Sequence, residues 1–228
     1  MRAPARKGFS FRGKSMAFRK MGKEFLMNTF FFFGDSLTLG VNDTRIPGGW
    51  VSRFAVMAAE QRLLTVPPDT VYNLGARRHS SREILARWQE ELERRRFPGV
   101  EPRLVFCFGV SDTVIVEGRE VVSVEESLAN ARKILTDAMD VTKETLLISA
   151  PPVADPGHRD RIGRLNAAFA ALCAELTVPY VSLFSVLENA DAYMRDLDDG
   201  IHPGPDGCAF FAEKLLAAPA MQVLLEEE

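Results

Sequence analysis

The sequence contains only three cysteines, three histidines and no long apolar run. Three cysteines in 228 residues are too few for a disulfide framework, and their spacing matches no zinc-binding pattern. A membrane-spanning helix needs roughly 18 or more consecutive apolar residues, so no integral membrane segment is expected. Proline (13) and glycine (16) are moderate, and a hydrophobic share of 46% excludes a disordered chain or a fibrous repeat. These absences predict a soluble, cytoplasmic protein without a metal site.

Acidic residues are missing from the first 23 positions, which carry eight basic side chains. The remaining chain holds 20 basic and 31 acidic residues, a net charge of −11. Because binding to phosphates needs a basic face, nucleic acid is not expected as a partner. We predict that residues 1–24 form a disordered basic leader and that residues 25–228 form a single domain. The leader is either a targeting segment or lies upstream of a start at Met16, Met21 or Met27.

Short strand-like segments alternate with amphipathic helical stretches over the rest of the chain. Two helical stripes, within 84–92 and 162–176, have apolar residues at steps of three and four. Continuous apolar strands suit a sheet that is buried on both faces. Five strands separated by helices predict an α/β fold with a five-stranded parallel, doubly wound sheet. The five strand-like segments are Thr29–Phe33, Thr70–Asn73, Leu104–Phe108, Thr145–Ser149 and Tyr180–Leu183.

Two helix starts have capping signals. Ser123 and Glu126 have the spacing of a capping box, so a helix is predicted to begin directly after Ser123. Asp206 follows a Pro-Gly-Pro turn and is expected to cap the last helix.

Four loops carry the candidate chemistry, because ligands bind at the carboxyl ends of the strands in such sheets. The loops contain Gly34–Leu37, Asn73–Gly75, Gly109–Asp112 and Asp199–His202. All four are predicted to lie at the same edge of the sheet. Their side chains are therefore candidates for one common site.

Ser36 lies at a strand-to-helix junction, where backbone N–H groups can face a developing oxyanion. A serine hydroxyl is a weak nucleophile and needs a base that a third group orients. Asp199 and His202, three residues apart, are able to supply both. Gly75 has no side chain that would block its N–H from a substrate oxygen.

These loops resemble the blocks of the GDSL family of esterases and lipases, also called SGNH hydrolases. Gly34–Leu37 reads Gly-Asp-Ser-Leu, Asn73–Gly75 resembles the second block, and Asp199–His202 the last. The resemblance covers roughly residues 28–218, with the blocks in the family's order. It implies a three-layer α/β/α flavodoxin-like fold for the 25–228 domain and a reaction that needs no cofactor.

The resemblance also implies a role for each matching residue. Ser36 would be the nucleophile, His202 the general base and Asp199 its partner, with the N–H groups of Ser36 and Gly75 in the oxyanion hole. The third block departs from the family, because Ser111 stands where an asparagine amide completes the oxyanion hole. The shorter hydroxyl of Ser111 predicts a slow enzyme, a water at this position or lost activity.

Other residues compete for these roles. Asp155 and His158 form a second Asp-x-x-His string after the fourth predicted strand, although its Pro-Gly centre reads as a turn. His79 is expected at the surface or the pocket rim, beside an Arg77-Arg78 pair that would bind an anionic substrate group or remain solvated. Cys107 is predicted to be a core residue rather than a nucleophile.

The sequence as a whole predicts a serine hydrolase of carboxylic esters that acts through an acyl-enzyme on Ser36. Its expected partner is a small-molecule ester, and the oligomeric state stays open. Two alternatives remain. One is a carbohydrate O-deacetylase or thioesterase with the same triad. The other is a catalytically weakened domain that binds an acylated ligand, an alternative that only Ser111 favours.

Overall fold

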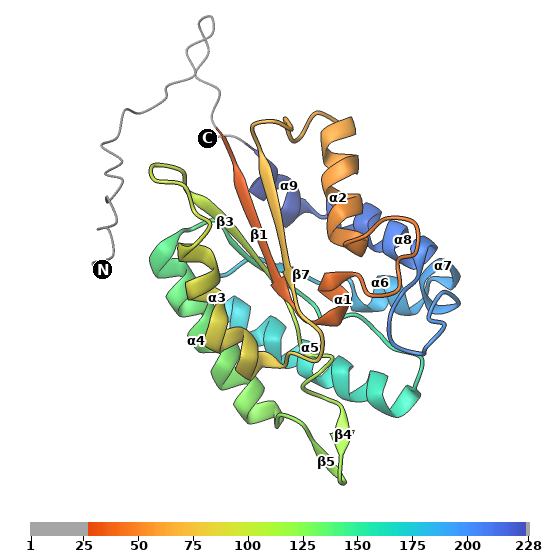
Figure 1. Cartoon of the computed structure of the whole chain (residues 1–228). Coiled ribbons are helices and arrows are strands. Elements are labelled where there is room, and N and C mark those ends of the chain that lie inside the picture. Colours follow the sequence, from red (N-terminus) through yellow and green to blue (C-terminus); the bar gives the residue numbers. More distant parts are fainter. Residues whose placement is uncertain (1–26, 227–228) are drawn as a thin grey trace, which may run out of the picture.

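A computed structural model of the chain describes residues 27–226, and the leader predicted for residues 1–24 lies outside the described residues. Figure 1 shows a central sheet with helices on both of its faces. The sheet has five strands, all parallel, in the order β2-β1-β3-β6-β7, which confirms the predicted α/β fold. The strands are β1 (Thr29–Gly34), β2 (Thr70–Gly75), β3 (Pro102–Cys107), β6 (Thr145–Ile148) and β7 (Tyr180–Val181).

The four consecutive phenylalanines of β1 explain why both faces of the sheet are covered. Side chains alternate between the faces of a strand. Phe30 and Phe32 therefore join one apolar cluster, whereas Phe31 and Phe33 join another, and all four are fully buried. The first cluster includes residues of α2 (Gly49–Glu60), α8 (Pro205–Leu216) and α9 (Pro219–Leu225). The second includes residues of α3 (Ser81–Glu93), α4 (Val124–Val141) and α5 (Pro156–Leu176).

The strand register brings the ends of the three strands β2, β1 and β3 to one level. Gly34, the last residue of β1, pairs with Gly75 at the end of β2 and with Cys107 at the end of β3. The loops that follow these strands therefore leave the sheet side by side. This is the edge at which the sequence predicts the site.

The helix starts agree with the sequence in one case and differ in the other. The hydroxyl of Ser123 accepts the N–H of Glu126, so Ser123 caps α4 as predicted. The cap of α8 is Gly204, and the prediction for Asp206 was wrong. Asp206 lies in the first turn of α8, and its carboxylate forms an ion pair with Arg45 at 2.8 Å. Helix α9 follows α8, so α8 is also not the last helix.

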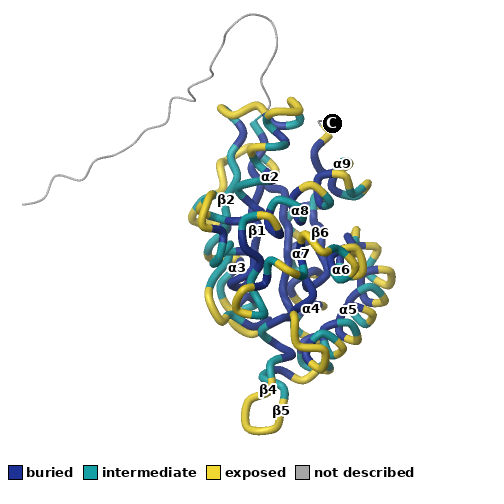
Figure 2. Tube along the Cα trace, turned by 90° about the vertical axis from the view of Figure 1, so that its right-hand side faces the viewer, coloured by how far each residue is buried: buried dark blue, intermediate teal, exposed yellow. Residues whose placement is uncertain are grey.

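Several short elements surround the same edge of the sheet. They are α1 (Ser36–Leu39), α6 (Phe184–Glu188), α7 (Asp191–Met194) and a hairpin of β4 (Ile115–Val116) and β5 (Arg119–Glu120). In Figure 1 the hairpin projects from the bottom of the body, below α1. Figure 2 shows that the tip of this hairpin is exposed, whereas the central strands are buried.

Within residues 27–226, no single helix is long and apolar enough to cross a membrane. In this described part of the chain, the helices α8 and α9 reach the length and apolar composition of a span only when taken together, and they are bent by 74° at the break between them.

Candidate active site

Ser36 is the first residue of α1 and is held at the end of β1 by a tight turn. Asp35 caps the helix, since its Oδ1 accepts the N–H of Leu37 at 2.9 Å. Gly34 must lack a side chain, because a Cβ there would lie 2.1 Å from Oγ1 of Thr38 and 2.3 Å from the carbonyl oxygen of Cys107. Close packing of α1 against β1 thus fixes Ser36, which is 8% exposed.

The structure brings together the three side chains for which the sequence predicts catalytic roles. The Oγ of Ser36 lies 2.7 Å from Nε2 of His202. On the other side of the imidazole ring, Nδ1 lies 2.7 Å from Oδ2 of Asp199. Side chains 166 positions apart in the sequence therefore form one hydrogen-bonded chain. This arrangement can move a proton from the hydroxyl to the imidazole while the carboxylate orients the ring.

The Asp199 carboxylate is ionised in this arrangement. Partial burial opposes its ionisation, but hydrogen bonds from the backbone N–H and the ring of His202, and from the N–H of Ile201, hold the pKa of Asp199 well below its usual range. An ionised carboxylate can only accept a hydrogen bond, so the proton of the imidazole ring resides on Nδ1 of His202 and points at Asp199. Nε2 is then left as the acceptor for the Ser36 hydroxyl.

The loop that carries Asp199 and His202 is shaped by one glycine and one neighbouring amide. Gly200 has a φ of 80°, a left-handed conformation that glycine adopts without strain. Its carbonyl accepts the N–H of Ala154, which ties the loop to the segment that follows β6. The side-chain amide of Asn42 donates to the carbonyl of His202 at 3.4 Å. These two contacts fix the loop in the position in which His202 reaches Ser36.

Gly75 lies beside the site, but its N–H already has a partner. It donates to Oδ1 of Asn73 at 3.0 Å. The amide of Asn73 in turn donates to the carbonyls of Thr38 and Gly48, at 2.9 and 3.1 Å. A Cβ at Gly75 would lie 2.2 Å from the backbone nitrogen of Leu39, so only glycine fits against the end of α1. Asn73 therefore joins three backbone segments around Ser36, and sequence reasoning did not assign it this role.

Ser111 and Asp112 of the third loop have different surroundings. Ser111 is half-buried, and its side chain makes no hydrogen bond with the described residues. Asp112 is fully buried, with Oδ1 accepting the N–H of Ser81 at 2.7 Å and Oδ2 accepting the hydroxyl of Ser127 at 2.5 Å. Asp112 thus joins this loop to α3 and α4. Ser111, unlike Asp112, therefore has a side chain that is free to bond to a ligand.

A second buried carboxyl group precedes the candidate nucleophile. Asp35 is 1% exposed, and its Oδ2 has no hydrogen-bond partner among the described residues. Burial, with a smaller contribution from Asp112, raises the pKa of Asp35 to about 7, although backbone N–H groups oppose the rise. Asp35 is therefore a buried cap whose charge changes near neutral pH. Sequence reasoning placed Asp35 in the first motif but assigned it no role of its own.

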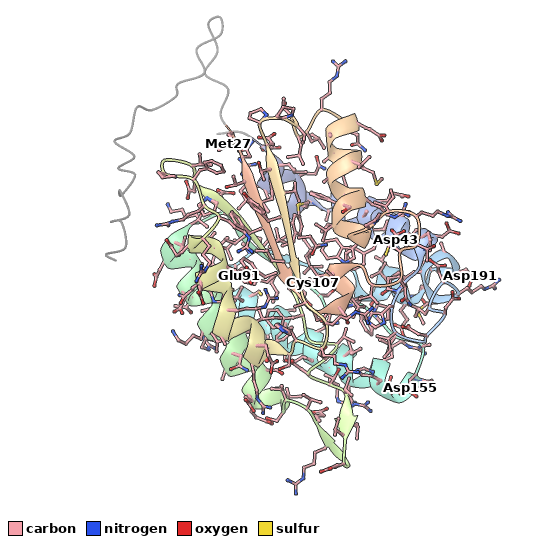
Figure 3. The ribbon with its side chains drawn as sticks, in the orientation of Figure 1. Met27, Asp43, Glu91, Cys107, Asp155 and Asp191 are labelled. Atoms are coloured by element: carbon pink, nitrogen blue, oxygen red, sulfur yellow. The ribbon has the colours of Figure 1, made fainter. Side chains whose placement is uncertain are left out.

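The alternative pair of Asp155 and His158 is not assembled. Asp155 caps α5 by accepting the N–H of His158 at 2.6 Å, and it lies at the edge of the body in Figure 3. The ring of His158 is buried, with Nε2 3.0 Å from Oγ1 of Thr113 and 3.1 Å from the carbonyl of Val110. Burial lowers the pKa of His158. Its ring thus supports the loop that carries Ser111 and does not contact Ser36.

The remaining candidates lie outside the hydrogen-bonded chain. Nδ1 of His79 accepts Nε–H of Arg87 at 3.0 Å, and burial lowers the pKa of His79. Arg77 and Arg78 are both exposed. Cys107 is buried in the middle of the body, as Figure 3 shows, and burial raises its pKa well above the usual range. Among residues 27–226, no group of three His, Cys, Asp or Glu side chains is placed to hold a metal ion.

Comparison with solved structures agrees with this architecture. The chain is similar to an acetylxylan esterase, Axe2 from Geobacillus stearothermophilus, with a TM-score of 0.67 and 17% identity over 88% of this chain and 95% of that one. A lipase/acylhydrolase from Enterococcus faecalis has a TM-score of 0.65 and 22% identity over 83% and 94% of the two chains. An α/β hydrolase, LAE5 from the metagenome of Lake Arreo in Spain, has a TM-score of 0.67 and 18% identity over 88% and 97%. At these identities the likeness shows the fold.

No curated protein matches the sequence. The model of the GDSL-like lipase/acylhydrolase family matches residues 32–210, a segment that contains Ser36, Asp199 and His202. The match covers well over half of the chain and begins and ends within the described fold. The chain therefore belongs to the GDSL-like lipase/acylhydrolase family, the SGNH hydrolases.

Proposed function

We propose that the protein hydrolyses carboxylic esters through an acyl-enzyme formed on Ser36. The observation that carries this proposal is the unbroken chain of two 2.7 Å contacts from Ser36 through His202 to Asp199. Membership of a lipase/acylhydrolase family supports the same class of reaction. No step of this mechanism needs a cofactor.

The proposed reaction has two halves. In the first, the hydroxyl oxygen of Ser36 attacks the ester carbonyl carbon while Nε2 of His202 takes the hydroxyl proton. The tetrahedral intermediate collapses, the alcohol leaves with the proton from His202, and the acyl group stays on Ser36. In the second half, water attacks the acyl-enzyme, His202 takes its proton, and the acid product leaves as Ser36 regains a hydrogen. Asp199 keeps the ring in the orientation that both halves need.

The oxyanion would be stabilised at the start of α1. The N–H of Ser36 is the first donor, since unpaired N–H groups at a helix start favour negative charge. Gly75 is the second predicted donor. To reach the oxyanion, its N–H must either leave Oδ1 of Asn73 or bond to both oxygens at once. The hydroxyl of Ser111 is the third predicted donor, and it is not engaged elsewhere in the described residues.

Labelling with a fluorophosphonate tests the nucleophile directly. We expect wild-type protein to be labelled at one site, and Ser36→Ala to lose both labelling and hydrolysis of nitrophenyl esters while keeping its circular dichroism spectrum. A series of nitrophenyl esters of increasing acyl length would then define the acyl preference. Acetyl esters, including acetylated sugars, should be tested first, because one solved structure with a similar fold is an acetylxylan esterase. Thioesters belong in the same series. Labelling that persists in Ser36→Ala would refute the assignment.

A catalytically weakened domain that binds an acylated ligand is the second candidate function. Ser111 favours it, because a hydroxyl is shorter than the amide that the family resemblance leads us to expect. If Ser111 faces the oxyanion, Ser111→Asn should raise kcat more than it changes KM, since the restored bond forms chiefly in the transition state. Wild-type protein that shows no labelling, beside a Ser111→Asn variant that gains it, would favour the binding function.

A further inference from the structure

Arg77 and Arg78 stand directly beside the turn that carries the candidate nucleophile. They follow β2 in a turn whose first residue, Ala76, donates its N–H to the carbonyl of Gly34 at 3.1 Å. Gly34 is two positions before Ser36, and His79 closes the turn by donating its N–H to Ala76 at 3.4 Å. Both arginines therefore emerge at the edge of the sheet that holds Ser36.

The two guanidinium groups have no acidic partner. Both residues are exposed, and neither side chain makes a hydrogen bond or ion pair with any of residues 27–226. Other arginines of the chain are paired, since Arg53 is bound to Asp43 and Arg82 to Glu126. Residues 24–228 carry a net charge of −11, so acidic side chains are available to arginines in general. Other basic side chains such as Arg62 also lack a partner, but Arg77 and Arg78 are adjacent in sequence and emerge at the edge that holds Ser36.

Like the exposed Arg62, Arg78 has an unusual backbone conformation. Its φ is 63°, in the left-handed region that non-glycine residues rarely adopt. Glycine would adopt this conformation without strain, yet the chain places a long cationic side chain there. Residues held in such conformations cluster at ligand-binding and catalytic sites. Because Arg62 shares this conformation, Arg78 is distinguished by its place at the edge that holds Ser36, next to a second exposed arginine.

Guanidinium groups suit one class of ligand in particular. The planar fork of an arginine donates two parallel hydrogen bonds to a carboxylate, and two adjacent arginines also supply the charge that an acidic body otherwise lacks. We propose that Arg77 and Arg78 bind a carboxylate on the substrate, so that the preferred esters are anionic. This inference rests on the proposed esterase function, because it assigns the substrate class of the same site.

Two esters of the same shape test this preference. The first is the mono-4-nitrophenyl ester of adipic acid, which carries a free carboxylate. The second is 4-nitrophenyl 6-methylheptanoate, in which an isopropyl group replaces that carboxylate. We expect the ratio of kcat/KM for the anionic ester to that for the neutral ester to fall about tenfold in Arg77→Gln/Arg78→Gln, as for two exposed ionic contacts. High salt should lower the same ratio in the wild type.

Arg62→Gln is the matched control. Arg62 is also exposed, has a φ of 62° and makes no side-chain contact with the described residues, but it lies between α2 and the amino end of β2, whereas Arg77 and Arg78 follow the carboxyl end of that strand. It should leave the ratio unchanged. An equal loss on both esters, no loss in the double variant, or the same loss in Arg62→Gln would overturn the proposal.

A binding measurement separates this proposal from the esterase function. If wild-type protein hydrolyses neither ester, the proposed function fails, and calorimetric titration with adipate still tests the anion site. Adipate that binds wild type and Arg62→Gln but not the double variant supports the site. Equal binding to all three proteins, or binding to none, refutes it.

Discussion

Replacing Asp35 by asparagine should change the pH dependence of stability more than any other single substitution near the site. Burial raises the pKa of this carboxyl group from 3.8 to about 7 in the folded protein. Between these values the unfolded chain has lost the proton and the folded protein keeps it, so rising pH favours unfolding. Above pH 7 the folded protein has also lost this proton, and the full free-energy cost of ionising the buried carboxyl group applies. A shift of about three pKa units corresponds to about 4 kcal/mol, because one unit is 1.36 kcal/mol.

Asparagine keeps the cap, since its Oδ1 can still accept the N–H of Leu37, but it removes the ionisation. Its NH₂ group takes the place of Oδ2, which has no partner among the described residues, so a constant penalty of about 1–3 kcal/mol is expected at every pH. The pH-dependent part is separate from this penalty. The stability of Asp35→Asn relative to wild type should therefore rise by about 3 kcal/mol between pH 4.5 and pH 8.5.

Urea denaturation at the two pH values, followed by circular dichroism, measures this difference. Asp155→Asn is the matched control, because Asp155 also caps a helix through its carboxylate but is exposed. We expect the control to change the free energy of unfolding by a similar small amount at both pH values. A difference between Asp35→Asn and wild type that is the same at pH 4.5 and 8.5 would show that Asp35 is ionised in the folded protein throughout, and the reasoning from burial would fail.

Four other substitutions test the packing and the assignment of the histidines. Trp88→Ala should lower the free energy of unfolding by about 3–5 kcal/mol in urea denaturation, because the indole is fully buried against two phenylalanine rings. Gly34→Ala should lower both the thermal midpoint and fluorophosphonate labelling, since the new Cβ would collide with the Thr38 hydroxyl and move α1. His202→Ala should lose labelling with little change in thermal midpoint, whereas His158→Ala should lose stability and keep labelling; the reverse pattern would contradict the assignment.

The sheet could be predicted from the sequence because its strands are apolar on both faces. Four consecutive phenylalanines at Phe30–Phe33 do not fit a half-exposed strand, and the structure buries all four between two layers of helices. The helices α3 and α5 were equally visible, since Trp88 and Phe169 lie on regular apolar stripes. Such patterns reflect burial, which is why they predict layers well.

Short elements and caps were less visible because their sequence signals are local and ambiguous. An aspartate just after a Pro-Gly-Pro turn is a common cap. Here the cap is Gly204 and the helix already begins at Pro205, and the carboxylate of Asp206 forms an ion pair with Arg45 instead. The β4–β5 hairpin has only two residues in each strand, which is too short for an alternating pattern to predict it. Boundaries of this kind depend on contacts between distant segments.

The order of the motifs along the chain predicted which loops would meet, but not what each side chain would bind. Only the structure shows that the N–H of Gly75 is engaged by Asn73, or that His158 faces Thr113 rather than Ser36. These partners lie on different elements, and their distances depend on how the loops pack. A motif fixes residue types and spacing, whereas hydrogen-bond partners depend on three-dimensional placement.

The aspartates that stand beside Ser36 and Ser111 show why a motif match alone does not identify chemistry. Asp35 caps α1 from a buried position, and Asp112 joins α3 and α4 through two buried hydrogen bonds. Each carboxyl group stabilises the backbone that presents the neighbouring serine, and neither belongs to the chain from Ser36 to Asp199. In each loop the aspartate therefore holds the backbone in place, while the adjacent serine makes no part of that support. This division explains how the third loop keeps its shape around Asp112 while Ser111 stands where the family resemblance predicts asparagine.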